Sequence, residues 1–154
     1  MMRIDFVDET NLDTAARVHA LSWRASHAEI CAPAFLSVHT EERQQEYLRK
    51  KLQGGSWIFL LTDDIPVGLV AVTGNQIEDL YVLPDQQGRG YGTALLVHAI
   101  RECAGTPTLW VLETNRRAIR FYERHGFQPT GRRNRENGPL AELEYALETE
   151  KVKR

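Results

Sequence analysis

The chain has 154 residues, enough for one domain with a sizeable core, and its 42% hydrophobic and 26% charged residues are typical of globular proteins. A formal net charge of −2 provides no overall field that would attract nucleic acid or an anionic membrane. Its two cysteines are too few for a disulfide framework and lack metal-ligand spacing, and its apolar runs are too short to span a bilayer.

The N-terminal half begins with a strand, continues with two helices and ends in three strands. Residues 3–7 (RIDFV) predict the first strand, and the following DETN offers caps for a helix over residues 12–26. A second helix is predicted over residues 40–52, because glutamates fall in its first turn, lysines fall in its last turn, and two glycines follow it. The three strands are joined by the turn sequences DDIP and GN and cover residues 56–62, 66–73 and 77–83.

The C-terminal half contains two strand–helix units and a final pair of strands. The first helix, residues 91–103, has one apolar face, formed by Leu96, Ala99, Ile100 and Cys103. A strand at 108–112 and a helix at 116–125 follow, and the last strands are predicted at 127–132 and 140–147, with a charged hairpin end at 131–138. We expect a single α/β (α+β) domain over residues 1–148 and a charged, frayed tail over 149–154.

Three glycines, at 88, 90 and 92, stand where the strand at 77–83 gives way to the helix at 91–103. The first amides of a helix lack intrahelical partners and carry partial positive charge, so a helix start without β-carbons suits a phosphate. A plain strand–helix turn is the alternative. A P-loop is excluded because no Gly-Lys-Ser/Thr ending is present, and a dinucleotide fingerprint is disfavoured because Thr93 occupies its third glycine position.

The sequence QGRGYG resembles the Gln/Arg-x-x-Gly-x-Gly/Ala signature of the GNAT superfamily of acetyl-CoA-dependent N-acetyltransferases, matching it at Gln87, Gly90 and Gly92. The later block LWVLETNRRAIRFYERHGF, with Asn115 and Tyr122, is similar to that family's later βα unit, and SWRASHAEICAPAFL to its N-terminal helical region. The resemblance implies a mixed sheet of about seven strands, splayed between strands 4 and 5 and flanked by about four helices.

The resemblance also implies that acetyl-CoA is the co-substrate. Its pantetheine arm would bond the backbone of the fourth strand, and its pyrophosphate would rest on the amides of the glycine segment. Asn115 would bond the arm while also capping its helix. The arginines are more typical of a solvated face, and Arg89 is the one among them chosen for the adenosine phosphates. The cofactor-binding residues expected on this basis are Leu80, Tyr81, Val82, Gln87, Gly88, Arg89, Gly90, Tyr91, Gly92, Thr93 and Asn115.

Two residues are expected to handle protons, because a substrate ammonium with a pKa of about 10 must lose a proton before it attacks. By its place in the family block, Tyr122 is the acid for the departing thiolate; the alternative is a packing tyrosine on a stripe with Ala118 and Phe121. Glu78 is the expected base. Asp79, predicted to point to the opposite face, and ordered water remain alternatives.

Trp23 and His27, four residues apart on the first helix, would share a face and border the acceptor pocket by family resemblance. Trp23 is equally compatible with the core, and His27 departs from the tyrosine common among relatives. Neither the remaining histidines nor the cysteines are given a role, and an acetyl-cysteine route lacks an identifiable base.

We therefore interpret the chain as a cytoplasmic N-acetyltransferase that transfers acetyl directly from acetyl-CoA to a primary amine, either a small molecule or a peptide or protein N-terminus. No metal, nucleic acid or membrane partner is expected, and a homodimer is left open. The alternatives are a non-catalytic acyl-CoA-binding regulatory module and an acyltransferase that uses another donor or acceptor atom.

Overall fold

The computed structural model describes residues 1–28, 34, 37–135 and 141–147. Cys31 and the predicted tail at 149–154 lie outside these ranges. Within them the α-helices are α1 (Leu12–His27), α3 (Glu41–Gln53), α4 (Tyr91–Glu102) and α5 (Arg116–Arg124), with a short 3-10 helix, η1 (Pro84–Gln86). The strands are β1 (Met2–Phe6), β2 (Trp57–Asp63), β3 (Ile65–Thr73), β4 (Gln76–Val82), β5 (Thr108–Leu112), β6 (Phe127–Asn134) and β7 (Glu142–Leu147).

The seven strands form one mixed sheet in the order β1-β2-β3-β4-β5-β7-β6, in which β4 and β5 are parallel and every other neighbouring pair is antiparallel. The α/β (α+β) class and the seven strands predicted from sequence are confirmed, and each described helix lies within one or two residues of its predicted bounds. One strand was predicted too short. β6 continues through Asn134, so residues 133 and 134 of the predicted hairpin end pair with β7, and its residues 136–138 lie outside the described ranges.

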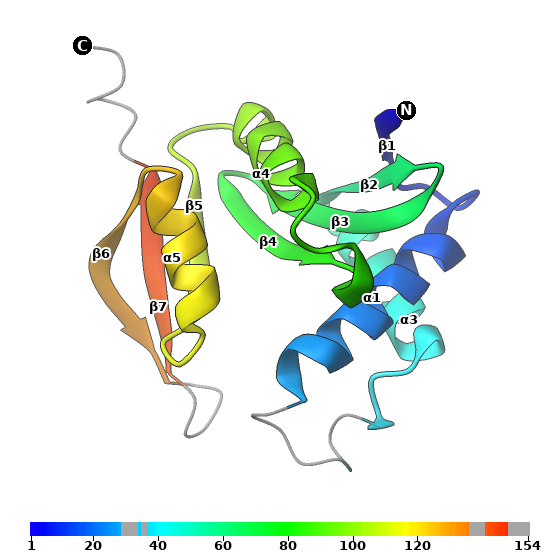
Figure 1. Cartoon of the computed structure of the whole chain (residues 1–154), viewed down its shortest axis with the longest axis horizontal. Coiled ribbons are helices and arrows are strands. Elements are labelled where there is room, and N and C mark those ends of the chain that lie inside the picture. The colour runs from blue at the N-terminus through cyan, green and yellow to red at the C-terminus, as the bar shows by residue number, and fades with distance from the viewer. Residues whose placement is uncertain (29–33, 35–36, 136–140, 148–154) are drawn as a thin grey trace.

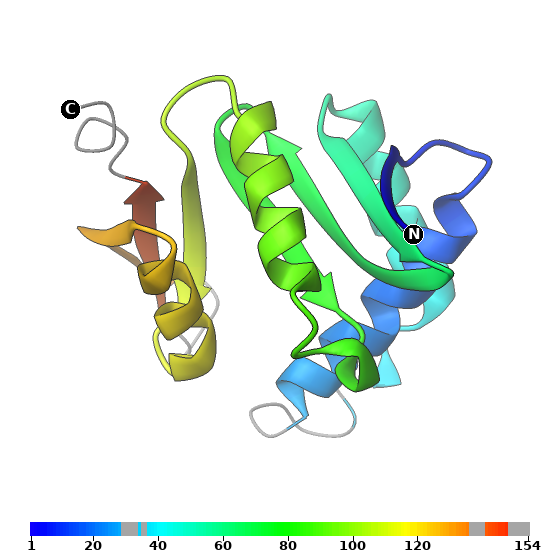
Figure 2. The same cartoon turned by 45° about the horizontal axis from the view of Figure 1, so that its top comes forward.

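Helices cover both faces of the sheet, with α4 and α5 on one face and α1 and α3 on the other (Figures 1 and 2). On the first face, Leu95 and Leu96 of α4 are fully buried, and α4 lies over β3 and β4. On the second face, Leu12 of α1 and Leu48 of α3 are buried against β2 and β3. No helix within the described ranges is long and apolar enough to cross a membrane.

The parallel pair β4–β5 separates soon after it begins. Only Gln76 pairs with Thr108 and Ile77 with Leu109, and β5 then continues its pairing with β7 alone. Both views show β4 and β5 diverging beyond this point (Figures 1 and 2). The splay predicted between strands 4 and 5 is therefore confirmed, and it places the free edge of β4 next to the glycine segment that follows.

Candidate active site

The glycine segment forms a left-handed turn into α4. Gly88 and Gly90 have φ values of 82° and 86°, and Gly90 is the N-cap of the helix. Such angles suit glycine because other residues suffer a clash at Cβ. An ideal β-carbon at either position would meet nothing within 4 Å, so the turn is open to solvent on that side. The first amides of α4 are consequently presented beside the carboxyl end of β4, where an anion is favoured.

The side chains of this segment serve the protein itself. The Gln87 amide donates to the carbonyl of Val82 at 3.2 Å and so braces the end of β4. The Tyr91 phenol donates to Asp63 of β2 at 2.7 Å, which directs its ring away from the splay. Arg89 is exposed. Gln87 and Tyr91 can therefore take part in cofactor binding chiefly through their backbone.

Helices α4 and α5 approach one another at this end of the splay. The Thr93 hydroxyl lies 3.3 Å from Nε2 of His125, and an ideal β-carbon on Gly92 would lie 3.5 Å from the Phe121 ring. That distance is an ordinary van der Waals contact. A methyl group at position 92 would therefore fit the protein as it stands, while occupying the gap between the two helices.

Helix α5 carries the residues predicted to act from the β5 side. The Asn115 side chain accepts a hydrogen bond from the Ala118 amide at 3.2 Å, which confirms the predicted N-cap. Tyr122 is half-buried, with its ring edge-on to Phe121 and Phe127, and burial raises its pKa to about 12. Among the described residues its phenol has no hydrogen-bond partner. Geometry thus leaves the hydroxyl available, and its role as an acid remains a prediction.

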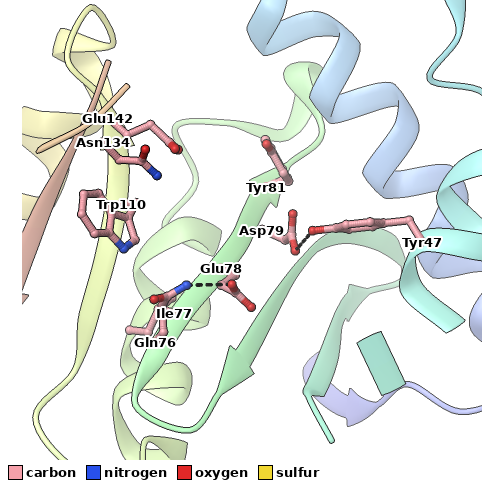
Figure 3. Close-up of a pocket in the computed structure, with 9 residues that line it drawn as sticks. All are labelled: Tyr47, Gln76, Ile77, Glu78, Asp79, Tyr81, Trp110, Asn134 and Glu142. Carbon is pink, nitrogen blue, oxygen red and sulfur yellow. Dashed lines mark hydrogen bonds between the residues drawn. The ribbon is translucent and has the colours of Figure 1, made fainter. Parts of the chain in front are cut away.

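A polar cavity of about 420 Å³ spans the splay (Figure 3). Three of its lining residues are carboxylates and three are aromatic, and none of the nine is basic. They come from α3, β4 and β5, and from the ends of β6 and β7. The lining residues are Tyr47, Gln76, Ile77, Glu78, Asp79, Tyr81, Trp110, Asn134 and Glu142.

Glu78 stands at the wall of this cavity and accepts three hydrogen bonds. Lys51 of α3 donates at 2.6 Å, Thr73 at 2.7 Å and Gln76 at 2.8 Å (the last drawn in Figure 3). The carboxylate is therefore fixed in place beside the diverging edge of β4. Its role as the base remains a prediction.

The expectation that Asp79 points to the face opposite Glu78 is wrong. Both carboxylates line the same cavity, and Lys51 Nζ lies 2.6 Å from Glu78 and 3.6 Å from Asp79. The reason is a β-bulge: the register with β3 shifts between Leu69 and Ala71, and Asp79 has a φ of 53°. One extra residue in a strand interrupts the alternation of side chains between faces.

Asp79 is held by three side chains, His19, Tyr47 and Lys51, of which His19 is buried. Burial alone would raise its pKa, but the hydrogen bond from His19, the charge of Lys51 and the bond from Tyr47 together keep the pKa below its usual value. His19 Nε2 lies 3.1 Å from one carboxylate oxygen, and the Tyr47 phenol donates to the other at 2.9 Å (Figure 3). His19, to which no role is assigned from the sequence, is only 2% exposed and belongs to the surroundings of the cavity.

Trp23 and His27 share a face of α1, as their spacing predicted. Their rings stack with centroids 4.0 Å apart, and His39 stacks on Trp23 at 3.6 Å. Burial lowers the pKa of His27, which favours its neutral form. Neither side chain lines the cavity between β4 and β5, so an acceptor contact by this pair remains a prediction.

Comparison with known proteins agrees with the splayed strands and the glycine-capped helix, since the acetyltransferase (GNAT) family model matches residues 20–127. The chain belongs to the GNAT family. It is 38% identical over 76 residues to the peptidyl-lysine N-acetyltransferase YjaB of Salmonella typhimurium, a match of 49% of this chain and 52% of the relative. Against the protein of the same name from Escherichia coli it is 33% identical over 99 residues, 64% and 67% of the two chains.

The chain thus spans about half the length of the Salmonella relative that it matches. The GNAT fold is matched over nearly the whole length by the PaiA N-acetyltransferase of Thermoplasma acidophilum in complex with coenzyme A. That structure has a TM-score of 0.71 and 18% identity and covers 94% of this chain and 98% of its own. At this identity the likeness concerns the fold.

Several residues of this GNAT site were not singled out from the sequence: Tyr47, Lys51, Trp110, Asn134 and Glu142. Trp110 could have been found, because Leu109 and Val111 face the core and strand alternation sends Trp110 to the other face. Tyr47 and Lys51, four residues apart on α3, share one face of that helix, but only the fold brings that face to β4.

The described part of the chain contains histidine, aspartate and glutamate side chains and one cysteine, Cys103. No three His, Cys, Asp or Glu side chains there are grouped so as to hold a metal ion. Burial raises the pKa of Cys103 to about 11, so its thiol stays protonated at neutral pH and is a poor nucleophile.

Proposed function

We propose that this protein is an N-acetyltransferase that moves an acetyl group from acetyl-CoA directly to a primary amine. The observation that carries the proposal is the parallel pairing of β4 and β5, which stops at Ile77 and Leu109. Beyond that point a glycine-capped helix stands on one side of the splay and a carboxylate-lined cavity on the other. Membership of the GNAT family supports the same reaction class.

The residues present fit a coenzyme A molecule. The open, left-handed Gly88 and Gly90 leave room for phosphate oxygens to reach the first amides of α4. The backbone of Leu80 to Val82 does not pair with β5, so the edge of β4 on that side is available to an extended arm, in the manner of an added strand. Arg89, exposed at the turn, would meet a phosphate, and Asn115 would bond the arm from α5. Acetyl-CoA supplies the activated acetyl thioester.

The cavity favours a cationic acceptor. Its wall carries the carboxylates of Glu78, Asp79 and Glu142, and Trp110 and Tyr81 add aromatic faces that attract an ammonium group. Within this class, the relatives named peptidyl-lysine N-acetyltransferase support a lysine side chain as acceptor. Peptide N-termini and small amines are the other candidates, and Trp23 and His27 would border the acceptor from α1.

Proton transfer is assigned to two residues. Glu78 would take the proton from the acceptor ammonium, through water, which frees the nitrogen lone pair to attack the thioester carbonyl. As the carbon–sulfur bond breaks, Tyr122 would donate its phenolic proton to the departing thiolate. Because the pKa of Tyr122 is raised to about 12, the phenol is protonated at any working pH.

The proposal is tested by measuring thiol release from acetyl-CoA in the presence of three acceptors. These are a lysine peptide with a blocked N-terminus, a lysine-free peptide with a free N-terminus, and a small diamine. We expect fastest turnover with the lysine peptide and a mass increase of one acetyl group on its side chain. Binding of coenzyme A by calorimetry without thiol release for any amine would instead favour the regulatory-module alternative.

A further inference from the structure

Asp79 adopts a backbone conformation that is unusual for a residue with a side chain. Its φ of 53° lies in the left-handed region, and it forms the bulge of β4 two residues after Ile77, the last residue of β4 paired with β5. Glycine would adopt this conformation without a steric penalty. The chain instead places an aspartate there, so the surrounding structure must hold the bulge in place.

Side chains of helices α1 and α3 hold the Asp79 bulge in place. His19 of α1 contacts one oxygen of Asp79 at 3.1 Å, Tyr47 of α3 donates to the other at 2.9 Å, and Lys51 lies 3.6 Å away. The Asp79 side chain is only 12% exposed. The His19 ring is buried, and among the described residues its Nδ1 has no partner, so its one polar contact is the Asp79 carboxylate. Lys51 also bonds Glu78, which ties both carboxylates to the same helix.

We infer that His19 and Tyr47 are positioning residues: acting through Asp79, they hold the bulge of β4 and thereby the Leu80–Val82 backbone that binds the coenzyme A arm. The inference rests on the proposed function of the splayed strands. The bulge redirects the peptide groups that follow it, just where β4 has no neighbour on the β5 side to fix them. We call the contacts of His19 and Tyr47 with Asp79 the clamp. Loss of the clamp would let this edge of β4 relax toward regular pleating and misalign it with the coenzyme A arm.

A pair of variants separates backbone conformation from charge. Asp79→Ala removes the carboxylate and keeps the steric penalty at positive φ, whereas Asp79→Gly removes both. We expect Asp79→Ala to weaken coenzyme A binding about tenfold in calorimetry and to lower kcat/KM up to about 100-fold, as a misplacement of about 1 Å can. Asp79→Gly should recover most of the loss in coenzyme A affinity, a rescue that a direct contact of the carboxylate with the cofactor would not allow.

The histidine is tested by a double-mutant cycle. His19→Leu should weaken coenzyme A binding about as much as Asp79→Ala does, and His19→Gln, which keeps a donor, should restore part of it. In the Asp79→Gly background His19→Leu should have no further effect on affinity, because its target is absent. Thermal unfolding identifies variants that fail to fold. If His19→Leu does not fold, coenzyme A affinity is measured in Tyr47→Phe, which removes only the exposed hydrogen bond from the phenol to Asp79. We expect this variant to bind coenzyme A a few-fold more weakly.

Three results would decide against the clamp. Unchanged affinity in a folded His19→Leu variant, or in Tyr47→Phe if His19→Leu does not fold, would overturn it. An Asp79→Gly variant as impaired in coenzyme A affinity as Asp79→Ala would overturn it too, and would assign the carboxylate itself to cofactor binding. A wild-type protein that binds no coenzyme A would overturn the proposed function and this inference together, whereas normal wild-type binding with unaffected variants overturns the inference alone.

Discussion

The two sides of the splayed strands differ in the chemical groups that form them. On the α4 side, the features that suit a cofactor are backbone groups: the edge of β4 after Ile77, the left-handed glycines, and the first amides of α4. On the opposite side, the cavity is made of side chains: carboxylates and aromatic rings from α3, β4, β5, β6 and β7. The first side belongs to one continuous stretch of chain, and the second is assembled from distant segments.

This difference predicts how each side can be damaged. A site made of backbone groups keeps its atoms under substitution and is impaired by adding bulk. A site made of side chains is impaired by removing single atoms or charges. Substitutions that leave the fold intact should therefore affect cofactor affinity on the first side and turnover on the second, except at Asp79 and its donors, which affect cofactor affinity through the backbone of β4.

The largest effect is expected from removing the phenol of Tyr122. Tyr122→Phe keeps the ring and its edge-on contacts with Phe121 and Phe127, so stability should change little. Without the acid, kcat should fall about 100-fold or more, with coenzyme A affinity nearly unchanged. Because burial raises the pKa of Tyr122 to about 12, the wild-type rate should show no loss from tyrosine ionisation until well above pH 10. Wild-type turnover in the variant, with chemistry rate-limiting, would reduce Tyr122 to a packing residue.

A strong but pH-dependent effect is expected at Glu78. Glu78→Gln keeps the shape of the side chain and an amide oxygen that can still accept from Lys51 and Thr73. It removes the carboxylate that would act as the base. We expect kcat/KM to fall by up to about 100-fold near neutral pH, and the loss to shrink as pH approaches the pKa of about 10 at which the amine is already free. The acidic limb of the wild-type profile should disappear or move upward.

A matched control exists for this substitution. Asp79→Asn removes the neighbouring charge while keeping a side chain that tolerates positive φ. If Glu78 is the base, only the Glu78 variant should lose the acidic limb. An unchanged profile in Glu78→Gln would assign the proton to water or to another group.

On the backbone side, a branched side chain at position 92, where the family signature has only Gly or Ala, should impair the cofactor site. Gly92→Val places a β-carbon 3.5 Å from the Phe121 ring, an ordinary contact, and adds two further methyl groups between α4 and α5. Gly92, unlike Gly90, does not have a positive φ, so the substitution adds bulk without backbone strain. We expect coenzyme A to bind about tenfold more weakly in calorimetry, equivalent to about 1.4 kcal/mol.

Gly105→Val serves as the control for Gly92→Val. Its β-carbon would meet nothing within 4 Å, and Gly105 lies in the loop after α4, away from the glycine turn. Affinity for coenzyme A should be that of the wild type. Equal affinities for the Gly92 and Gly105 variants would mean that no cofactor group passes between α4 and α5 at this point.

The same contrast explains what could be predicted from sequence. Helices and strands follow from local signals, such as the glutamates, lysines and glycines around α3, and the structure agrees with them within a residue or two. The glycine turn is contiguous, so a helix start without β-carbons was predicted from QGRGYG, and the structure adds that Gly88 and Gly90 are left-handed. The splay between β4 and β5 came from family resemblance, since nothing in either strand alone specifies it.

The side-chain site could not be predicted in the same way. The position of Asp79 was wrong because a bulge changes which face a residue points to, and no glycine or proline marks it in IEDLYVL. His19 looked like any histidine on a helix, and its buried contact with Asp79 joins residues 60 positions apart. Glu142 and Trp110 meet β4 only because β5 and β7 pair beside it.

The smallest effect is expected at Asn115, where the two kinds of site meet. Its side chain caps α5, and its predicted second role is to bond the cofactor arm. Asn115→Ala should cost about 1 kcal/mol of stability, a few degrees in Tm, by removing the cap. Asn115→Asp keeps an oxygen for the Ala118 amide and should leave Tm nearly unchanged, but it loses the amide donor and adds a negative charge. If Asn115 also contacts the arm, both variants should bind coenzyme A a few-fold more weakly. If only the alanine variant changes, in Tm and not in affinity, Asn115 is a helix cap alone.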